Sequence, residues 1–162
     1  MANKDIVKGF EPFGKLLHSA VYVNGATAVY PGDLVSMDNA GLIAKAAAGT
    51  SPLLGVALNY AAASGDVLVA DHPSQEFLGQ CDDATVDAQT DIGLNYNITV
   101  GTASTLYKRS AMAIDASTQA TDSNLPLRLL RVGPAIDNAL GDKVDMIVKI
   151  NNHQLGNAVV GL

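Results

Sequence analysis

Residues 30–80 read YPGDLVSMDNAGLIAKAAAGTSPLLGVALNYAAASGDVLVADHPSQEFLGQ. Short apolar runs recur in this stretch, and residues that favour turns precede each of them. The runs are LVSM (34–37), LIAK (42–45), LLGVAL (53–58) and VLVA (67–70). Gly, Asp and Asn supply the backbone angles of tight turns, and branched residues favour the half-buried face of a sheet. Strands this short, with turns about every ten residues, predict a mainly β fold: a small antiparallel β-barrel or sandwich.

The bulk composition sets the size and quality of the core. The chain has 162 residues, which suits one domain with extensions. Hydrophobic residues make up 48% and charged residues 16%, a balance that excludes an intrinsically disordered chain. Aromatic residues are only 5%, and the apolar content depends on Ala, Val and Leu. Because alanine buries little area, we expect a thin core that gains support from subunit contacts or a partner.

Charge and hydropathy patterns narrow the range of possible partners and cellular locations. The net charge is −6, and the ten basic residues are scattered, so we expect no nucleic acid partner. No apolar run approaches the roughly 20 residues of a membrane helix, and the start does not resemble a signal peptide. We therefore expect no membrane partner and synthesis in the cytosol. The single cysteine, Cys81, allows no intrachain disulfide.

Residues 1–19 lack the alternation of a strand and form an N-terminal arm in this interpretation. Five apolar side chains gather in it: Phe10, Pro12, Phe13, Leu16 and Leu17. Exposed apolar residues on a flexible end often mark a docking segment. An arm can equally pack on its own domain, as some chain ends do. The sequence leaves both interpretations open.

Residues 20–150 are predicted to form the β-rich domain. The Asn24-Gly25 pair predicts a hairpin turn between strands at 20–23 and 26–30. Alternation over 94–100 predicts a strand with Leu94, Tyr96, Ile98 and Val100 on its buried face and polar residues on its wet face.

The end of this domain carries the clearest strand signal. Residues 115–126 are small and polar and are expected to form the longest loop, followed by a strand over 127–132. In the last strand, Val144, Met146, Val148 and Ile150 face one way, while Ile147 faces the other with its polar neighbours. Residues 151–162 form a C-terminal tail that we expect to be mobile alone and ordered when bound.

Motifs that carry chemistry are missing from the sequence. It contains no G-x-G-x-x-G, no complete G-x-x-x-x-G-K-[ST], no G-x-S-x-G and no H-E-x-x-H. Asp71-His72 with Glu76 is the only metal-like group, and Pro73 opposes the helix that would align it, so a polar turn is favoured. Cys81 could pair with His72 or His153 as a nucleophile, but a lone Cys is more often a buried apolar residue. We expect neither catalysis nor a cofactor.

Glycine turns and short strands recur in a characteristic arrangement over about residues 9–155. The segments are GFEP (9–12), PGDLV (31–35), GLI (41–43), LGVA (54–57), GDVLV (65–69), GDKV (141–144) and NNHQ (151–154). This arrangement resembles the small capsid decoration (cement) proteins of tailed bacteriophages. The resemblance implies a compact β-rich virion protein without catalytic residues, which binds the major capsid protein on the outer surface of the expanded head. It also implies homotrimers at three-fold and quasi-three-fold positions, assembled in the host cytoplasm.

The five apolar arm residues are the candidate capsid-binding residues in this hypothesis. A recognition module for a glycan or host surface is the main alternative. Glycan sites present aromatic rings, whereas this chain has no Trp and its five tyrosines are scattered. A small enzyme or carrier domain is a third possibility, although Lys45 lacks the hairpin-tip setting of a modified lysine.

Overall fold

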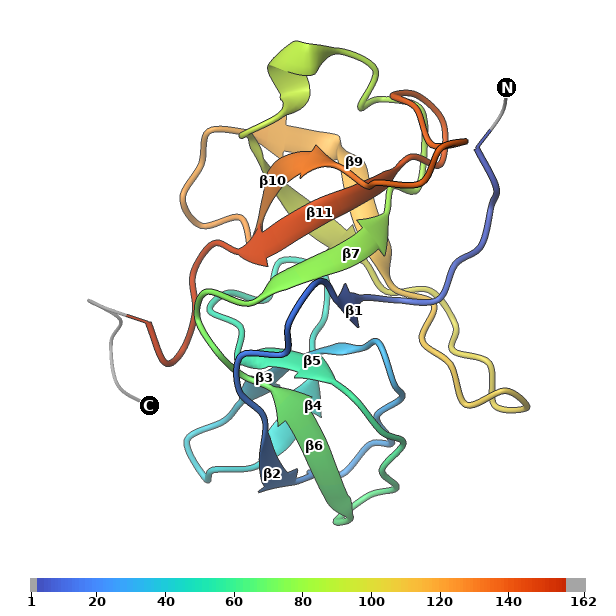
Figure 1. Cartoon of the computed structure of the whole chain (residues 1–162). Helices are drawn as coiled ribbons and strands as arrows, with labels where there is room; N and C mark the ends of the chain where they lie inside the picture. Colours follow the sequence, from blue (N-terminus) through green and yellow to red (C-terminus); the bar gives the residue numbers. More distant parts are fainter. Residues whose placement is uncertain (1–2, 157–162) are drawn as a thin grey trace.

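The computed structural model describes residues 3–156, and these form two antiparallel sheets one above the other (Figure 1). Within that range the only helical segment is a 3-10 turn, η1 (Gln89–Asp91). The prediction of a mainly β fold is confirmed. The arrangement is sandwich-like, with no barrel closed by continuous strand pairing among the described residues.

The larger sheet has six strands in the order β1-β7-β11-β10-β8-β9. Their bounds are β1 (Glu11–Pro12), β7 (Glu76–Gln80), β11 (Asp145–Ile150), β10 (Leu127–Val132), β8 (Asn95–Thr99) and β9 (Ala113–Ala120). A single parallel bridge between Cys81 and Ile114 brings the end of β7 against β9. The sheet therefore curls until the end of β7, next to the edge strand β1, meets the opposite edge strand β9.

The smaller sheet has five strands in the order β2-β6-β5-β3-β4. Their bounds are β2 (Ala20–Val23), β6 (Asp66–Ala70), β5 (Gly55–Ala57), β3 (Leu34–Met37) and β4 (Ile43–Lys45). Asn24, just after β2, forms a parallel bridge with Ile43 of β4. This sheet curls in the same way, and it lies below the larger sheet in Figure 1.

Strands of the smaller sheet contribute to two separate cores. Leu34 and Val56 belong to the core shared with the larger sheet, while their neighbours Val35 and Ala57 belong to a second core of the smaller sheet. Successive side chains of a strand point to opposite faces, so these strands are buried on both. This explains their nearly unbroken apolar runs.

The N-terminal arm is built into the larger sheet. Phe10 is buried in the shared core, and its backbone N–H donates to the Gly32 carbonyl at 2.9 Å. Its ring lies against Gly79, where an added Cβ would come within 2.4 Å of the ring. Glu11 and Pro12 then pair with β7. For this part of the arm, packing on its own domain is the correct interpretation.

The predicted Asn24-Gly25 hairpin is wrong. β2 pairs with β6, and residues 26–30 contribute only a bridge between Val29 and Ala61. The Asn24 side chain is buried instead of exposed at a turn, and its amide donates to the carbonyls of Thr27 (2.7 Å) and Ala62 (3.0 Å). The Asn24 side chain thus closes its own loop and ties it to the distant Ala62 segment, which local turn statistics do not anticipate.

Three further details differ from the sequence-based expectations. The first half of the predicted loop at 115–126 is strand, because β9 continues to Ala120 along β8 and Thr118 accepts a bond from the Asn97 N–H at 2.9 Å. Its small polar residues suit an edge strand. Asn95, expected on a wet face, is buried, and Ile147 is buried although it faces away from its apolar neighbours. The strand over 127–132 is confirmed.

The described part of the tail, residues 151–156, runs along the smaller sheet. The Leu53 N–H donates to the Asn152 carbonyl at 3.0 Å, and the Gln154 N–H donates to the Leu53 carbonyl at 2.8 Å. The Gln154 side chain binds both the N–H and the carbonyl of Met37, each at 2.8 Å. The expectation of a mobile tail does not hold for these residues, and its remainder, 157–162, lies outside the described range.

Candidate functional site

The arm crosses from the larger sheet to the smaller one between Phe13 and Ser19, and Gln75 holds this crossing. The Gln75 side chain is buried, accepts from the Leu17 N–H at 2.9 Å and donates to the Glu76 carbonyl at 3.0 Å. The Phe13 N–H donates to the same Glu76 carbonyl at 2.8 Å. A buried amide that satisfies several backbone groups fixes the local chain path. The crossing is therefore ordered rather than loose.

Exposed apolar side chains follow one another along this ordered segment. Leu16 and Leu17 are 41% and 46% exposed, and Val21 and Val23 of the edge strand β2 are also exposed. A cavity of about 260 Å³ lies beside Leu17; its lining includes Phe13, Gly14, Lys15, Ser74, Gln75 and Glu76. We call Phe13, Leu16, Leu17, Val21 and Val23 the arm surface.

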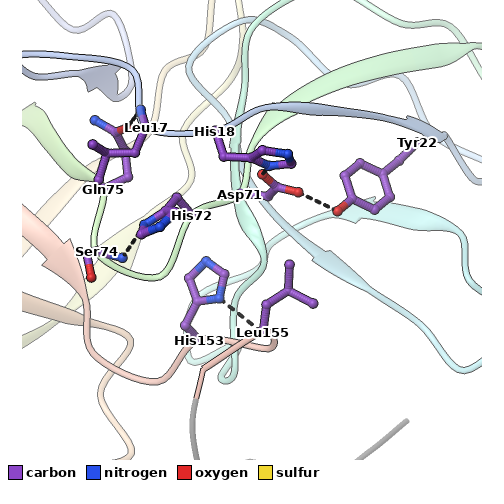
Figure 2. A network of polar contacts seen from close by, with 9 residues as sticks. All are labelled: Leu17, His18, Tyr22, Asp71, His72, Ser74, Gln75, His153 and Leu155. Carbon is purple, nitrogen blue, oxygen red and sulfur yellow. Dashed lines mark hydrogen bonds and ion pairs between the residues drawn. The ribbon is translucent and has the colours of Figure 1, made fainter.

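A buried carboxylate anchors the far end of the arm surface (Figure 2). Asp71 Oδ1 lies 2.6 Å from His18 Nδ1, and Asp71 Oδ2 accepts from the Tyr22 hydroxyl at 2.6 Å. Burial alone would raise the pKa of Asp71, but the bonds from Tyr22 and His18 outweigh it and hold that pKa below its usual value. The carboxylate is thus charged at neutral pH, and it fixes β2 and the end of the arm.

All three histidines of the chain come together at this junction (Figure 2). His72 Nδ1 accepts from the Ser74 N–H, and His153 Nδ1 accepts from the Leu155 N–H, each at 3.0 Å. His153 is only 6% exposed, and its Nε2 has no hydrogen-bond partner among the described residues. Burial lowers the pKa of His153 to about 4, so the ring is neutral at pH 7. The junction joins the arm, the β6–β7 connection and the tail.

The structure argues against Cys81 as a nucleophile, the role that the sequence analysis considered for it. Cys81 is fully buried in the shared core, and burial together with nearby Asp82 raises the pKa of its thiol to about 12. The reactive thiolate is therefore suppressed. Within residues 3–156, no group of three or more His, Cys, Asp or Glu side chains is placed to hold a metal ion. In the same range, no helix is long and apolar enough to cross a membrane.

The five candidate residues of the arm occupy different environments. Leu16 and Leu17 are exposed, and Phe13 is half-buried at the cavity. Pro12 is half-buried within β1. Phe10 is a core residue and offers no surface to a partner, which corrects its place among the candidates. Its sequence neighbours gave no sign of this, because the ring is accommodated by Gly79, far along the chain.

The sequence analysis missed the hairpin at residues 101–110. Ser104 and Arg109 pair across it, and it projects from the body of the molecule between β8 and β9 (Figure 1). Leu106 and Tyr107 at its tip are 79% and 77% exposed. The signal was present as an apolar pair before two cations, Lys108 and Arg109, within an otherwise polar stretch.

No protein-family model matches the sequence, and no curated protein matches it. The class of protein is therefore defined by its fold and by the geometry of its exposed surfaces. The chain is a two-sheet β protein with an ordered apolar surface along its arm and a projecting apolar hairpin tip.

Proposed function

We propose that this protein is a structural virion protein that binds the outer surface of a tailed-phage head. It stabilises the expanded capsid as a homotrimer at three-fold and quasi-three-fold positions, with the major capsid protein as its partner and the host cytoplasm as its place of assembly. The observation that carries the proposal is the arm surface, in which apolar side chains are exposed on a backbone fixed by Gln75 and Asp71.

The energetics of the arm surface suit docking. Complete burial of a Val or Leu side chain is worth about 1.5–3 kcal/mol, so covering four partly exposed ones supplies several kcal/mol. Because the segment is already ordered, docking loses little of this to conformational entropy. An edge strand without charged residues, such as β2, is a natural surface for a partner.

The proposed role, binding at repeated positions of the capsid lattice, suits a chain of this charge and size. Many modest contacts around a closed shell add up to tight retention without one strong site. A net charge of −6 disfavours association with the packaged nucleic acid. The role requires neither catalysis nor a cofactor.

The test is co-sedimentation of the purified protein with expanded capsids from which this protein has been stripped. We expect saturable binding at a copy number that matches the three-fold positions. Leu16→Ser with Leu17→Ser should weaken binding by at least about tenfold, because it removes burial worth more than 1.4 kcal/mol. Ile136→Ser is the matched control, because Ile136 is fully exposed in the loop between β10 and β11. Failure of the folded wild-type protein to bind any shell rejects the proposal.

One observation favours recognition of a glycan or host surface as a second candidate function. Tyr30 and Tyr60, far apart in sequence, have ring centroids 5.2 Å apart, and Lys108 Nζ lies 4.3 Å above the Tyr60 ring. Tyr60 is 37% exposed and Tyr30 is half-buried, so part of this aromatic pair remains accessible for stacking against a sugar. A glycan screen with Tyr60→Ala as the comparison tests this candidate: binding that Tyr60→Ala abolishes supports it, and no binding dismisses it.

A further inference from the structure

The hairpin at residues 101–110 is a rigid projection. Ser104 and Arg109 exchange two backbone hydrogen bonds, of 2.9 and 3.2 Å, and the Tyr107 N–H donates to the Ser104 hydroxyl at 3.2 Å. At its base, the Ser110 N–H donates to the Pro31 carbonyl at 3.1 Å. Lys108 adopts a left-handed φ of 50°, a conformation that non-glycine residues adopt only where the surroundings impose it. The tip is therefore ordered before it meets any partner.

The composition of the tip is that of a protein–protein contact. Leu106 and Tyr107 are almost wholly exposed, and Lys108 and Arg109 follow them. Tyrosine and arginine are enriched among the residues that dominate binding energy at interfaces. A fixed hairpin that exposes these side chains to water gains free energy when a second surface covers them.

A cavity of about 270 Å³ lies between the hairpin and the arm, with a positive lining. Lys8, Lys108 and Arg109 line it, and Glu11 is its single acidic residue. Lys8 Nζ pairs with Glu11 at 3.1 Å. Within residues 3–156, neither Lys108 nor Arg109 forms an ion pair with a carboxylate. Three of the ten basic residues of the chain thus gather at one place. Lys108 Nζ lies over the Tyr60 ring, and no carboxylate of the described residues neutralises its charge or that of Arg109.

Another copy of the same chain offers the complementary charge. The chain carries a net charge of −6, so a second copy is acidic on balance. Asp82, Asp83 and Asp115, for example, lie close enough together to repel one another. A contact between two different patches is heterologous, and a heterologous contact closes into a trimeric ring when neighbouring copies are related by a one-third turn about a common axis. A positive, apolar tip on an acidic neighbour is such a contact.

We propose that the hairpin at residues 101–110 is the element by which one copy of this chain binds the next. Leu106 and Tyr107 are buried against the neighbour, and Lys108 and Arg109 face its acidic surface. This inference rests on the homotrimer of the proposed function and assigns its contact. It separates the surface that joins subunits from the arm surface that faces the shell.

The test measures the molar mass of the purified protein by light scattering after size exclusion, across a dilution series. We expect a wild-type trimer. Leu106→Ser with Tyr107→Ser should raise the concentration at which it dissociates by about 100-fold. Lys108→Glu with Arg109→Glu should also favour monomers, and 0.5 M salt should weaken the wild-type trimer because screening removes the charge attraction. Ile136→Ser, which changes a fully exposed apolar side chain elsewhere, should leave the trimer unchanged.

The partner is identified by a photoreactive phenylalanine derivative at position 107. Its cross-link should join two copies of the chain, both in solution and on reconstituted capsids. A wild-type monomer, a hairpin variant that stays trimeric, or a cross-link to the capsid protein instead overturns the inference. A wild-type trimer that binds no shell leaves the inference standing and rejects the proposed function, so the two failures are distinguishable.

Discussion

The two ends of the chain are held to the same body by different forces. The N-terminal arm is anchored by an apolar ring, since Phe10 lies in the shared core against Gly79. The tail is anchored by polar contacts, since Gln154 binds the backbone of Met37, and it places the His153 ring in a buried position. Apolar burial is insensitive to pH, whereas a buried neutral histidine is not. The anchors at Phe10 and at His153 should therefore respond to different stresses.

Phe10→Ala should have the largest effect on stability. Removing a fully buried phenylalanine loses its transfer free energy and leaves a cavity, which together cost about 3–5 kcal/mol. We expect a lower urea midpoint with a similar slope, measured by circular dichroism. Leu17→Ala is the control from the same arm, because Leu17 is exposed and should change stability by no more than about 0.5 kcal/mol. Equal effects of the two substitutions would show that the arm is not part of the core.

Acidification should have the next largest effect on stability, and it should act at the tail. The pKa of His153 is lowered to about 4 by burial, and the charges of His72 and Lys149 lower it further, while Asp71 raises it. The folded state binds this proton less readily than the unfolded chain. The stability that the neutral His153 ring contributes to the folded state is therefore fully present above pH 6.5. It falls by on the order of 2–3 kcal/mol as the pH drops toward 4.

His153→Asn isolates this contribution, because asparagine can keep an acceptor for the Leu155 N–H but does not titrate. The comparison is needed because other groups titrate as well. Burial raises the pKa values of Asp33, Asp82 and Asp145, which favours the folded state on acidification, whereas the lowered pKa of Asp71 has the opposite effect. Thermal unfolding at pH 7 and pH 4.5 should show a larger loss for the wild type than for the variant. Parallel losses in the two proteins would mean that His153 does not titrate with folding.

The sequence predicted what depends on local pattern and missed what depends on distant partners. Most strands were predicted because short apolar runs between turn residues have few other solutions, and β10 was predicted to the residue. The burial of Phe10 depends on Gly79, and the burial of Asn24 on the carbonyl of Ala62. The histidine junction likewise joins positions from three regions of the chain, so no local spacing could indicate it.

Gln154→Ala tests the polar anchor of the tail directly. It removes two hydrogen bonds of 2.8 Å to the Met37 backbone, and we expect a loss of about 1–2 kcal/mol. Hydrogen exchange should quicken at the Met37 amide, while the amides of β7, which pair with the arm, should keep their protection. Faster exchange in β7 as well would show that the tail and the arm are held cooperatively rather than by separate anchors.

Substitutions in the arm surface should have the smallest effect on stability. They therefore separate a role in docking from a role in folding. Leu16→Ser with Leu17→Ser removes exposed side chains, so the free energy of unfolding should change by no more than about 0.5 kcal/mol per residue. The backbone of the segment is held by the Gln75 side chain, which the substitutions leave intact. Urea unfolding of this variant should match the wild type, while its shell binding falls. A large loss of stability would instead mean that these leucines support the fold, and weakened shell binding could then no longer be attributed to a docking surface.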